Sequence, residues 1–111
     1  MSADPLQDVL DAMRALPGLR GCAVVDAETG MAWKTAGAED IQVLCEAASD
    51  YWRLHLRSGG HYAPQLGPLA AQVLVHAKGR ITVVGCAGTL LLVCVSHEPD
   101  RVDWARWKVL V

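Results

Sequence analysis

The chain has 111 residues, of which 52% are apolar and 20% are charged, a composition typical of a folded domain rather than of a disordered segment. A formal net charge of -2 gives no reason to expect non-specific attraction to nucleic acid or to anionic membranes. The sequence has no basic and apolar leader, and no uncharged run reaches the ~20 residues that a membrane-spanning helix needs. It therefore predicts one domain over residues 1–111 with no membrane span.

The first predicted elements are a helix and a β-hairpin. Asp4 is suited to cap a helix that begins at the following proline, and apolar residues at helical spacing extend that helix to Leu16. Two β-rich runs, residues 21–26 and 31–35, then flank a turn that ends in a glycine. This pattern predicts a hairpin.

The longest predicted helix covers residues 39–57 and is apolar around more of its surface than one contact requires. Its apolar residues span roughly 220° of the ideal helical wheel, whereas a helix that packs on one sheet needs an apolar stripe of about 100°. The polar side is formed by Gln42, Glu46, Ser49, Asp50, Arg53 and Arg57. The extra apolar surface predicts a second contact.

The second half of the chain predicts three strands between a loop and a final helix. Residues 58–69 contain glycines and prolines typical of a loop, and strands follow at residues 71–77, 80–85 and 89–96. The last helix is expected over residues 99–110. We expect its inward stripe to be Val102, Ala105 and Val109, and the sequence assigns no contact to Trp104 and Trp107.

Apolar residues at both parities of the later strands predict a sheet that is covered on both faces. The element order is helix, two strands, helix, three strands, helix. The predicted fold class is α/β, a three-layer α/β/α sandwich around a five-stranded, mainly antiparallel sheet. The first and last helices are assigned to one face, and the long helix to the other.

Four cysteines fit neither a zinc site nor a disulfide framework. All of them lie in apolar stretches, where a free thiol behaves as a small apolar side chain. These residues are Cys22, Cys45, Cys86 and Cys94. We expect buried thiols in a reducing compartment, which predicts a cytoplasmic location.

No catalytic motif is present in the sequence. It contains no phosphate-binding loop, no nucleophile elbow and no metalloprotease helix. The four histidines, at positions 55, 61, 76 and 97, are too scattered to predict a metal cluster. We interpret His55 as a hydrogen-bonded or interface residue, and His61 and Tyr62 as exposed loop residues. The sequence thus predicts a protein without enzymatic activity, metal or cofactor.

Apolar surface is what the sequence has in excess. Besides the long helix, the strand at residues 71–77 lacks the proline or charge that usually protects a sheet edge. Self-association about a twofold axis would cover both surfaces. The alternative is an ordinary buried helix beside a covered strand. The predicted interface residues are Val43, Ala47, Tyr51, Leu54, His55, Val73, Leu74 and Val75.

The segment LPGLRGCAVVDAETGMAW, residues 16–33, resembles the opening of a Roadblock/LC7 domain, and the wide apolar helix and later strands follow in the same order. The resemblance implies a profilin-like fold that dimerises through the second helix, here residues 39–57, and the third strand, here residues 71–77. It also implies a scaffold or regulator of small Ras-like GTPases, as in bacterial MglB-type members, or in eukaryotes a dynein light chain or a lysosomal-signalling scaffold. The chain departs from the family in having no phenylalanine and four tryptophans.

Two functions follow as hypotheses. The first is a homodimeric module that binds a small Ras-like GTPase or a related switch protein. The second is a small-molecule sensor, which requires a cavity lined by a few convergent polar groups. For such a cavity the sequence offers His55, Thr82 and the cysteines.

Overall fold

The computed structural model describes residues 4–58, 62–86, 88–97 and 104–110. In chain order its elements are α1 (Pro5–Arg14), β1 (Leu19–Asp26), β2 (Ala32–Ala36), α2 (Glu39–Ser58), α3 (Ala63–Leu66), β3 (Ala71–His76), β4 (Gly79–Gly85), β5 (Leu90–Ser96) and α4 (Trp104–Leu110). The strands form one antiparallel sheet in the order β2-β1-β5-β4-β3. This arrangement places β2 and β3 at its two edges.

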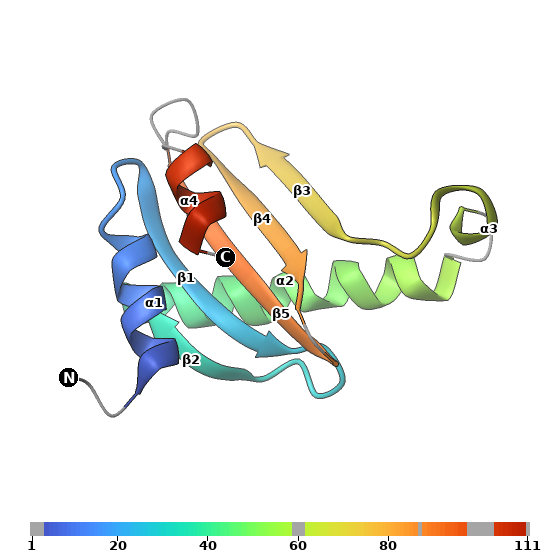
Figure 1. The fold of residues 1–111 in the computed structure, drawn as a ribbon, viewed down its shortest axis with the longest axis horizontal. Coiled ribbons are helices and arrows are strands. Elements are labelled where there is room, and N and C mark those ends of the chain that lie inside the picture. Colours follow the sequence, from blue (N-terminus) through green and yellow to red (C-terminus); the bar gives the residue numbers. More distant parts are fainter. Residues whose placement is uncertain (1–3, 59–61, 87, 98–103, 111) are drawn as a thin grey trace.

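The sheet is covered on both faces, as its sequence predicts. Neighbouring residues of a strand point to opposite faces. Cys22 and Cys94 therefore pack in the cluster with α1 and α4, and Ala23 and Val93 pack in the cluster with α2. Figure 1 shows α1 and α4 on one face of the sheet and α2 crossing the other. The α/β/α sandwich and the assignment of its covering helices are confirmed.

The first helix begins as its sequence predicts. The Asp4 carboxylate accepts a hydrogen bond from the backbone N–H of Gln7 at 3.1 Å, which satisfies one of the free donors at the helix start. The helix ends at Arg14, two residues before the end of the predicted stripe. Leu16 is nevertheless buried with Leu10, because the turn after α1 stays on the sheet.

The predicted hairpin is formed by β1 and β2. Gly30 ends its turn with φ of +77°, a conformation that glycine adopts without steric cost. The register shifts between Val24 and Val25 because Trp33 has no residue directly opposite it. This extra residue is a β-bulge, which bends β2 at the edge of the sheet.

The three later strands are confirmed to within one residue at each end. The segment before β3 differs from the prediction, because α3 occupies Ala63–Leu66 where only a loop was expected. A single turn of helix is too short to show apolar periodicity, so the sequence carried no signal for it.

The predicted inward stripe of the last helix is wrong. Ala105 is exposed and Val109 is 84% exposed, while Val102 and the predicted start of the helix lie outside the described residues. The inward residue is Trp107, whose indole N–H donates to the Cys94 sulfur at 3.2 Å in the buried cluster. An indole buries more area than alanine or valine and also finds a polar partner here, so it sets the orientation of α4.

The prediction of four buried thiols is wrong at one position. Cys22, Cys45 and Cys94 are buried, whereas Cys86 is exposed. Cys86 directly follows β4, where the chain leaves the sheet to turn toward β5. Burial raises the pKa of the Cys45 thiol to about 12, so this thiol is protonated at neutral pH.

Candidate interaction site

The side of α2 that faces away from the sheet carries exposed apolar residues. Val43 is 67% exposed, Tyr51 50% and Leu54 56%, and Ala47 between them is also exposed. These four residues, which we call the apolar flank, lie within about 80° of one another at the helical spacing of 100° per residue. The residues of α2 that contact the sheet are a separate set, namely Ile41, Cys45, Ala48 and Trp52.

The opposite side of α2 is polar and anchors the helix to the hairpin. A Glu46 carboxylate oxygen accepts the backbone N–H of Ala32 at 2.7 Å. The Arg53 guanidinium donates to the carbonyl oxygen of Ala27 at 3.0 Å. Because this side is turned toward β2 and the turn that precedes it, the apolar flank is turned away from β2. Within the described residues, no apolar cluster covers that flank.

The edge strand β3 offers free backbone groups to a further strand. The backbone N–H of Gly85 donates to the carbonyl of Ala70, and bonded and non-bonded pairs alternate along an antiparallel ladder. The N–H and C=O groups of Ala71, Val73 and Val75 therefore point away from β4. In the described part of the chain they make no hydrogen bond, and we call them the open edge.

The β3 side chains divide between the two faces of the sheet. Leu74 lies opposite Ile81, which packs in the cluster under α2. Val73 lies opposite Thr82 and so points to the other face, where it is 50% exposed; Val75, on the same face, is 76% exposed. The structure thus places Leu74 on the same face as the apolar flank of α2. Val73 and Val75 contribute only their backbone N–H and C=O groups to the proposed interface, because their side chains lie on the other face.

A polar atom beside the open edge also lacks a partner. The side-chain oxygen of Gln72, on the α2 face of β3, is buried and forms no hydrogen bond within the described residues. Leaving a buried acceptor unsatisfied costs about 1–3 kcal/mol. A hydrogen-bond donor from a second chain would remove this cost.

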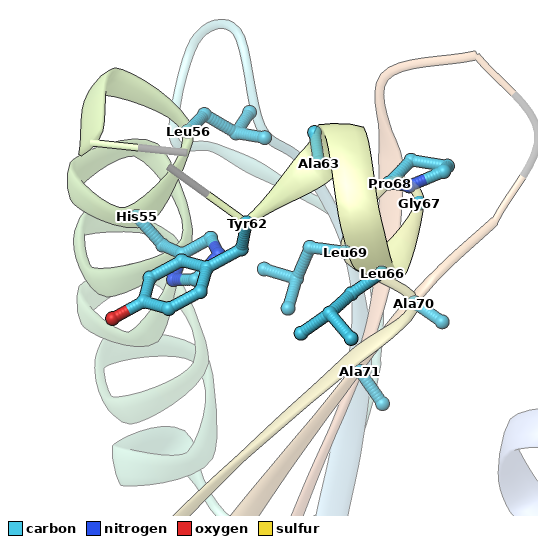
Figure 2. A pocket seen from close by; sticks show the side chains of 10 residues that line it. All are labelled: His55, Leu56, Tyr62, Ala63, Leu66, Gly67, Pro68, Leu69, Ala70 and Ala71. Carbon is cyan, nitrogen blue, oxygen red and sulfur yellow. The ribbon is translucent and has the colours of Figure 1, made fainter. Parts of the chain in front are cut away.

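A groove continues this surface past the start of β3. It has a volume of about 910 Å³ and lies between the end of α2, the helix α3 and the residues that lead into β3. We call it the α3 groove. Figure 2 shows Leu66 and Leu69 between the His55 and Tyr62 rings and the start of β3. These two rings are stacked with their centroids 6.1 Å apart. Tyr62 is the exposed loop residue that was expected, at 56% exposed, and His61 lies outside the described residues.

A second hollow of about 610 Å³ lies beyond the α3 groove, where Trp52 and Arg53 of α2 meet the turns at one end of the sheet. Leu56 and Leu69 line both spaces and separate them. The Arg53 guanidinium already bonds to Ala27 and pairs with Asp50. The guanidinium of this hollow is therefore already committed, and the carboxylate of Glu28 also lines the space.

Metal ligands and thiols are the remaining polar groups of interest. No group of three or more potential metal ligands occurs among them. Hydrogen bonding with Cys94 and burial raise the pKa of Cys22, whereas hydrogen bonds from Cys22 and Trp107 lower that of Cys94. Both thiols are covered by α1 and α4 and cannot meet a substrate. Of the helices described, none is both long and apolar enough to cross a membrane.

The fold is that of Roadblock/LC7 domains. The chain superposes on a Roadblock/LC7 domain from Streptomyces avermitilis with a TM-score of 0.73 and 12% identity, covering 96% of this chain and 88% of that chain. It superposes on Myxococcus xanthus MglB with a TM-score of 0.68 and 14% identity, covering 99% and 88%. It superposes on the gliding protein MglB from Thermus thermophilus with a TM-score of 0.72 and 15% identity, covering 93% of this chain and 77% of that chain. No family model and no curated protein matches the sequence.

The likeness confirms, at the level of fold, the resemblance that residues 16–33 carry. It covers nearly the whole chain, and apart from the single turn of α3 the element order is the one expected from the sequence. At 12–15% identity the likeness says nothing of which residues bind a partner.

Proposed function

We propose that this protein is a homodimeric scaffold without enzymatic activity, and that it assembles through the apolar flank of α2 and the open edge of β3. The observation that carries the proposal is that the polar side of α2 is bonded at the β2 edge of the sheet, so that the apolar flank is turned away from β2, and β3 is the opposite edge. At that edge the backbone groups of Ala71, Val73 and Val75 point away from β4, and on the apolar flank Val43 and Leu54 are more than half exposed. A second copy, related by a twofold axis, would cover both at once.

The open edge favours one register for the two β3 strands. All three outward residues find partners when Val73 lies opposite the partner's Val73, because Ala71 then lies opposite the partner's Val75. Each such pair exchanges two hydrogen bonds, so this register forms about six. If the two strands are shifted by two residues, one outward residue of each copy has no residue of the partner's β3 opposite it.

Neither surface is sufficient alone. Full burial of an apolar side chain is worth about 1.5–3 kcal/mol, and roughly half of that remains to be gained for side chains that are already half buried. Three such residues in each of two copies then contribute roughly 6 kcal/mol, whereas association costs about 4–15 kcal/mol. Strand pairing and the apolar flank must therefore act together to give a stable dimer.

Light scattering coupled to size exclusion tests the dimer directly. At micromolar concentration we expect twice the mass of the 11.9 kDa chain. A clean monomer under these conditions would refute the proposal.

Disulfide cross-linking tests the register. In the proposed register, Gln72 lies opposite the partner's Leu74. These two residues exchange no backbone hydrogen bonds with each other, and the side chains of such pairs lie closest. The double variant Gln72→Cys/Leu74→Cys should cross-link between copies under mild oxidation, with Cys86→Ser as the background. Neither single variant should do so. Cross-linking of Leu74→Cys alone would place Leu74 at the axis and contradict this register.

The partner class proposed for the dimer is a small Ras-like GTPase or a related switch protein. This part is supported by the Roadblock/LC7 fold and by the likeness to MglB structures, one of which has a tetrameric arrangement. The test is affinity capture from the native lysate in the presence of GTP or of GDP. We expect a GTPase whose retention depends on the nucleotide. Equal retention of all GTPases with either nucleotide would contradict it.

The α3 groove favours one alternative, a small-molecule sensor. The groove is large enough for a small ligand, but His55 and Tyr62 are the polar or aromatic side chains it offers among apolar ones. A specific thermal stabilisation by a small molecule would support the sensor. That stabilisation should disappear in a Tyr62→Ala variant.

A further inference from the structure

We infer that the α3 groove is a docking site for a second copy of this chain, and that it receives the turn between the partner's β3 and β4. The inference rests on the proposed dimer and adds a contact to it. It explains a helix that the sequence pattern does not predict and that packs little of its own surface. Leu66 of α3 is 77% exposed, and none of the four α3 residues is buried.

The position of the groove on the sheet is the first argument. Ala71 both lines the groove and belongs to the open edge. His55, at the other side of the groove, lies one residue beyond Leu54 of the apolar flank. The groove is thus continuous with both surfaces through which the dimer is proposed to form.

The register supplies the second argument. With Val73 opposite the partner's Val73, Ala70 lies opposite the partner's His76, and Leu69 lies opposite the partner's Ala77. The partner strand therefore ends beside the residues that lead into β3. The turn that follows it enters the space between these residues and α3.

The two faces of the sheet supply the third argument. Side chains alternate along β3, so His76 points to the same face as Leu74, which is the α2 face. A twofold axis perpendicular to the sheet keeps the α2 faces of both copies on one side. The partner's His76 is then directed toward the groove, where His55 and Tyr62 are stacked.

The chemistry of the turn is compatible with the groove. Ala77 is small and exposed, so it can approach Leu66 and Leu69 without displacing them. No carboxylate lines the groove, so the ammonium group of the partner's Lys78 would remain at its rim in water. Figure 2 shows the helix α3 standing over the start of β3, so that it encloses this space from the side away from α2.

Cross-linking between two singly substituted proteins tests the contact. Leu66→Cys and Ala77→Cys, each in the Cys86→Ser background, are mixed, allowed to exchange subunits and oxidised in a glutathione redox buffer. We expect a disulfide-linked dimer in the mixture. As a matched control, Leu66→Cys mixed with Glu28→Cys should give none, because Glu28 lies in the turn between β1 and β2.

The dissociation constant gives a second measurement. Leu66→Ser removes an apolar contact twice in a twofold dimer, so we expect roughly a 10-fold weaker dimer. Val109→Ser on α4 is the matched control, since Val109 is 84% exposed and lies on the other face of the sheet. It should leave the dissociation constant unchanged.

The outcomes separate this inference from the proposal beneath it. A monomer in light scattering overturns the proposed dimer, and the docking site with it. A dimer that shows neither the Leu66–Ala77 disulfide nor any weakening by Leu66→Ser overturns the docking site alone. A small molecule that binds the groove of the intact dimer would also overturn it, because the partner's turn would then have to be elsewhere.

Discussion

The two edges of the sheet differ in how their backbone groups are treated, although both edge strands are short and antiparallel. At β2, the outward N–H of Ala32 is bonded to Glu46 and the outward carbonyl of Thr35 accepts from the Gln7 side chain at 2.9 Å. Lys34 pairs with Asp4, and the bulge at Trp33 bends the strand. At β3, the outward groups have no such partners in the described part of the chain. One edge is closed against a further strand, and the other is open to it.

This difference shows that an exposed apolar residue does not by itself identify an interface. Trp33 is 61% exposed on β2 and is no less apolar than Val73 on β3. What distinguishes the two strands is whether the backbone beside the side chain is already bonded. Matched substitutions at the two edges should therefore have different effects.

The largest effect is expected from Leu54→Glu on the apolar flank. An unpaired charge buried between two copies costs several kcal/mol. The dissociation constant of the dimer should therefore rise by roughly 100-fold or more. Gln42→Glu, on the polar side of α2, adds the same charge without entering the interface and should leave the dimer intact. Sedimentation velocity over a range of concentrations measures both. Equal behaviour of the two variants would mean that the flank is not buried.

A proline at each edge gives the most direct comparison. Val73→Pro removes an outward N–H from the open edge of each copy and so two hydrogen bonds from the dimer, worth about 1 kcal/mol each. We expect roughly a 30-fold weaker dimer by the same measurement. Thr35→Pro removes the corresponding outward N–H from β2 and should not change the oligomeric state. Dissociation caused by the β2 variant would show that the wrong edge has been assigned.

Removing a hydrogen bond from the closed edge at β2 should lower the stability of each copy without weakening the dimer. Glu46→Ala removes the acceptor of the Ala32 N–H, and a hydrogen bond to a charged group is worth about 1.5–3 kcal/mol. Because Glu46 is only partly buried, we expect a loss of about 1 kcal/mol in the free energy of unfolding measured in urea. Amide exchange at Ala32 should become faster. Gln42→Ala, an exposed position on the same helix, serves as the control, and an equal loss there would remove the role given to Glu46.

The smallest effect concerns the ion pair beside β2. Hydrogen bonding to Lys34 and to the Gln7 backbone holds the pKa of Asp4 below its usual value of 3.8. A lowered pKa in the folded state means that this stabilisation is present above that usual value and is lost as the pH falls through the folded value. Lys34→Gln should move the pKa of Asp4 upward in an NMR titration. It should also destabilise the protein more at pH 6 than at pH 2, and the reverse order would contradict the assignment.

Much of the fold was predictable because the apolar periods are clear. Apolar residues at both parities of the later strands, such as β5, identify a sheet that is buried on both faces, and the capping residue Asp4 locates the start of α1. What the sequence could not supply was the orientation of short elements. In α4 the large side chain of Trp107 outweighs the stripe formed by smaller residues, and one turn of helix such as α3 has no period to detect.

The candidate site was predictable in part for the same reason. The surplus apolar side of α2 follows from helical geometry, and its members are the exposed ones. The strand was harder, because sequence alone does not give the register that decides which face a side chain takes. Val73 and Val75 therefore turned out to point away from α2, while Leu74 points toward the α2 face. The closed edge was not foreseeable at all, since Glu46 and Gln7 come from two different helices.

The single exposed thiol gives the protein a built-in attachment point for a probe. Cys86 is exposed while the other three cysteines are buried, so a maleimide dye should label one position in each copy without any substitution. Partial desolvation by the surrounding chain raises the pKa of Cys86, and labelling should therefore be faster in mildly alkaline buffer. Energy transfer between a donor and an acceptor attached at this position would report subunit exchange in real time, in the unaltered chain.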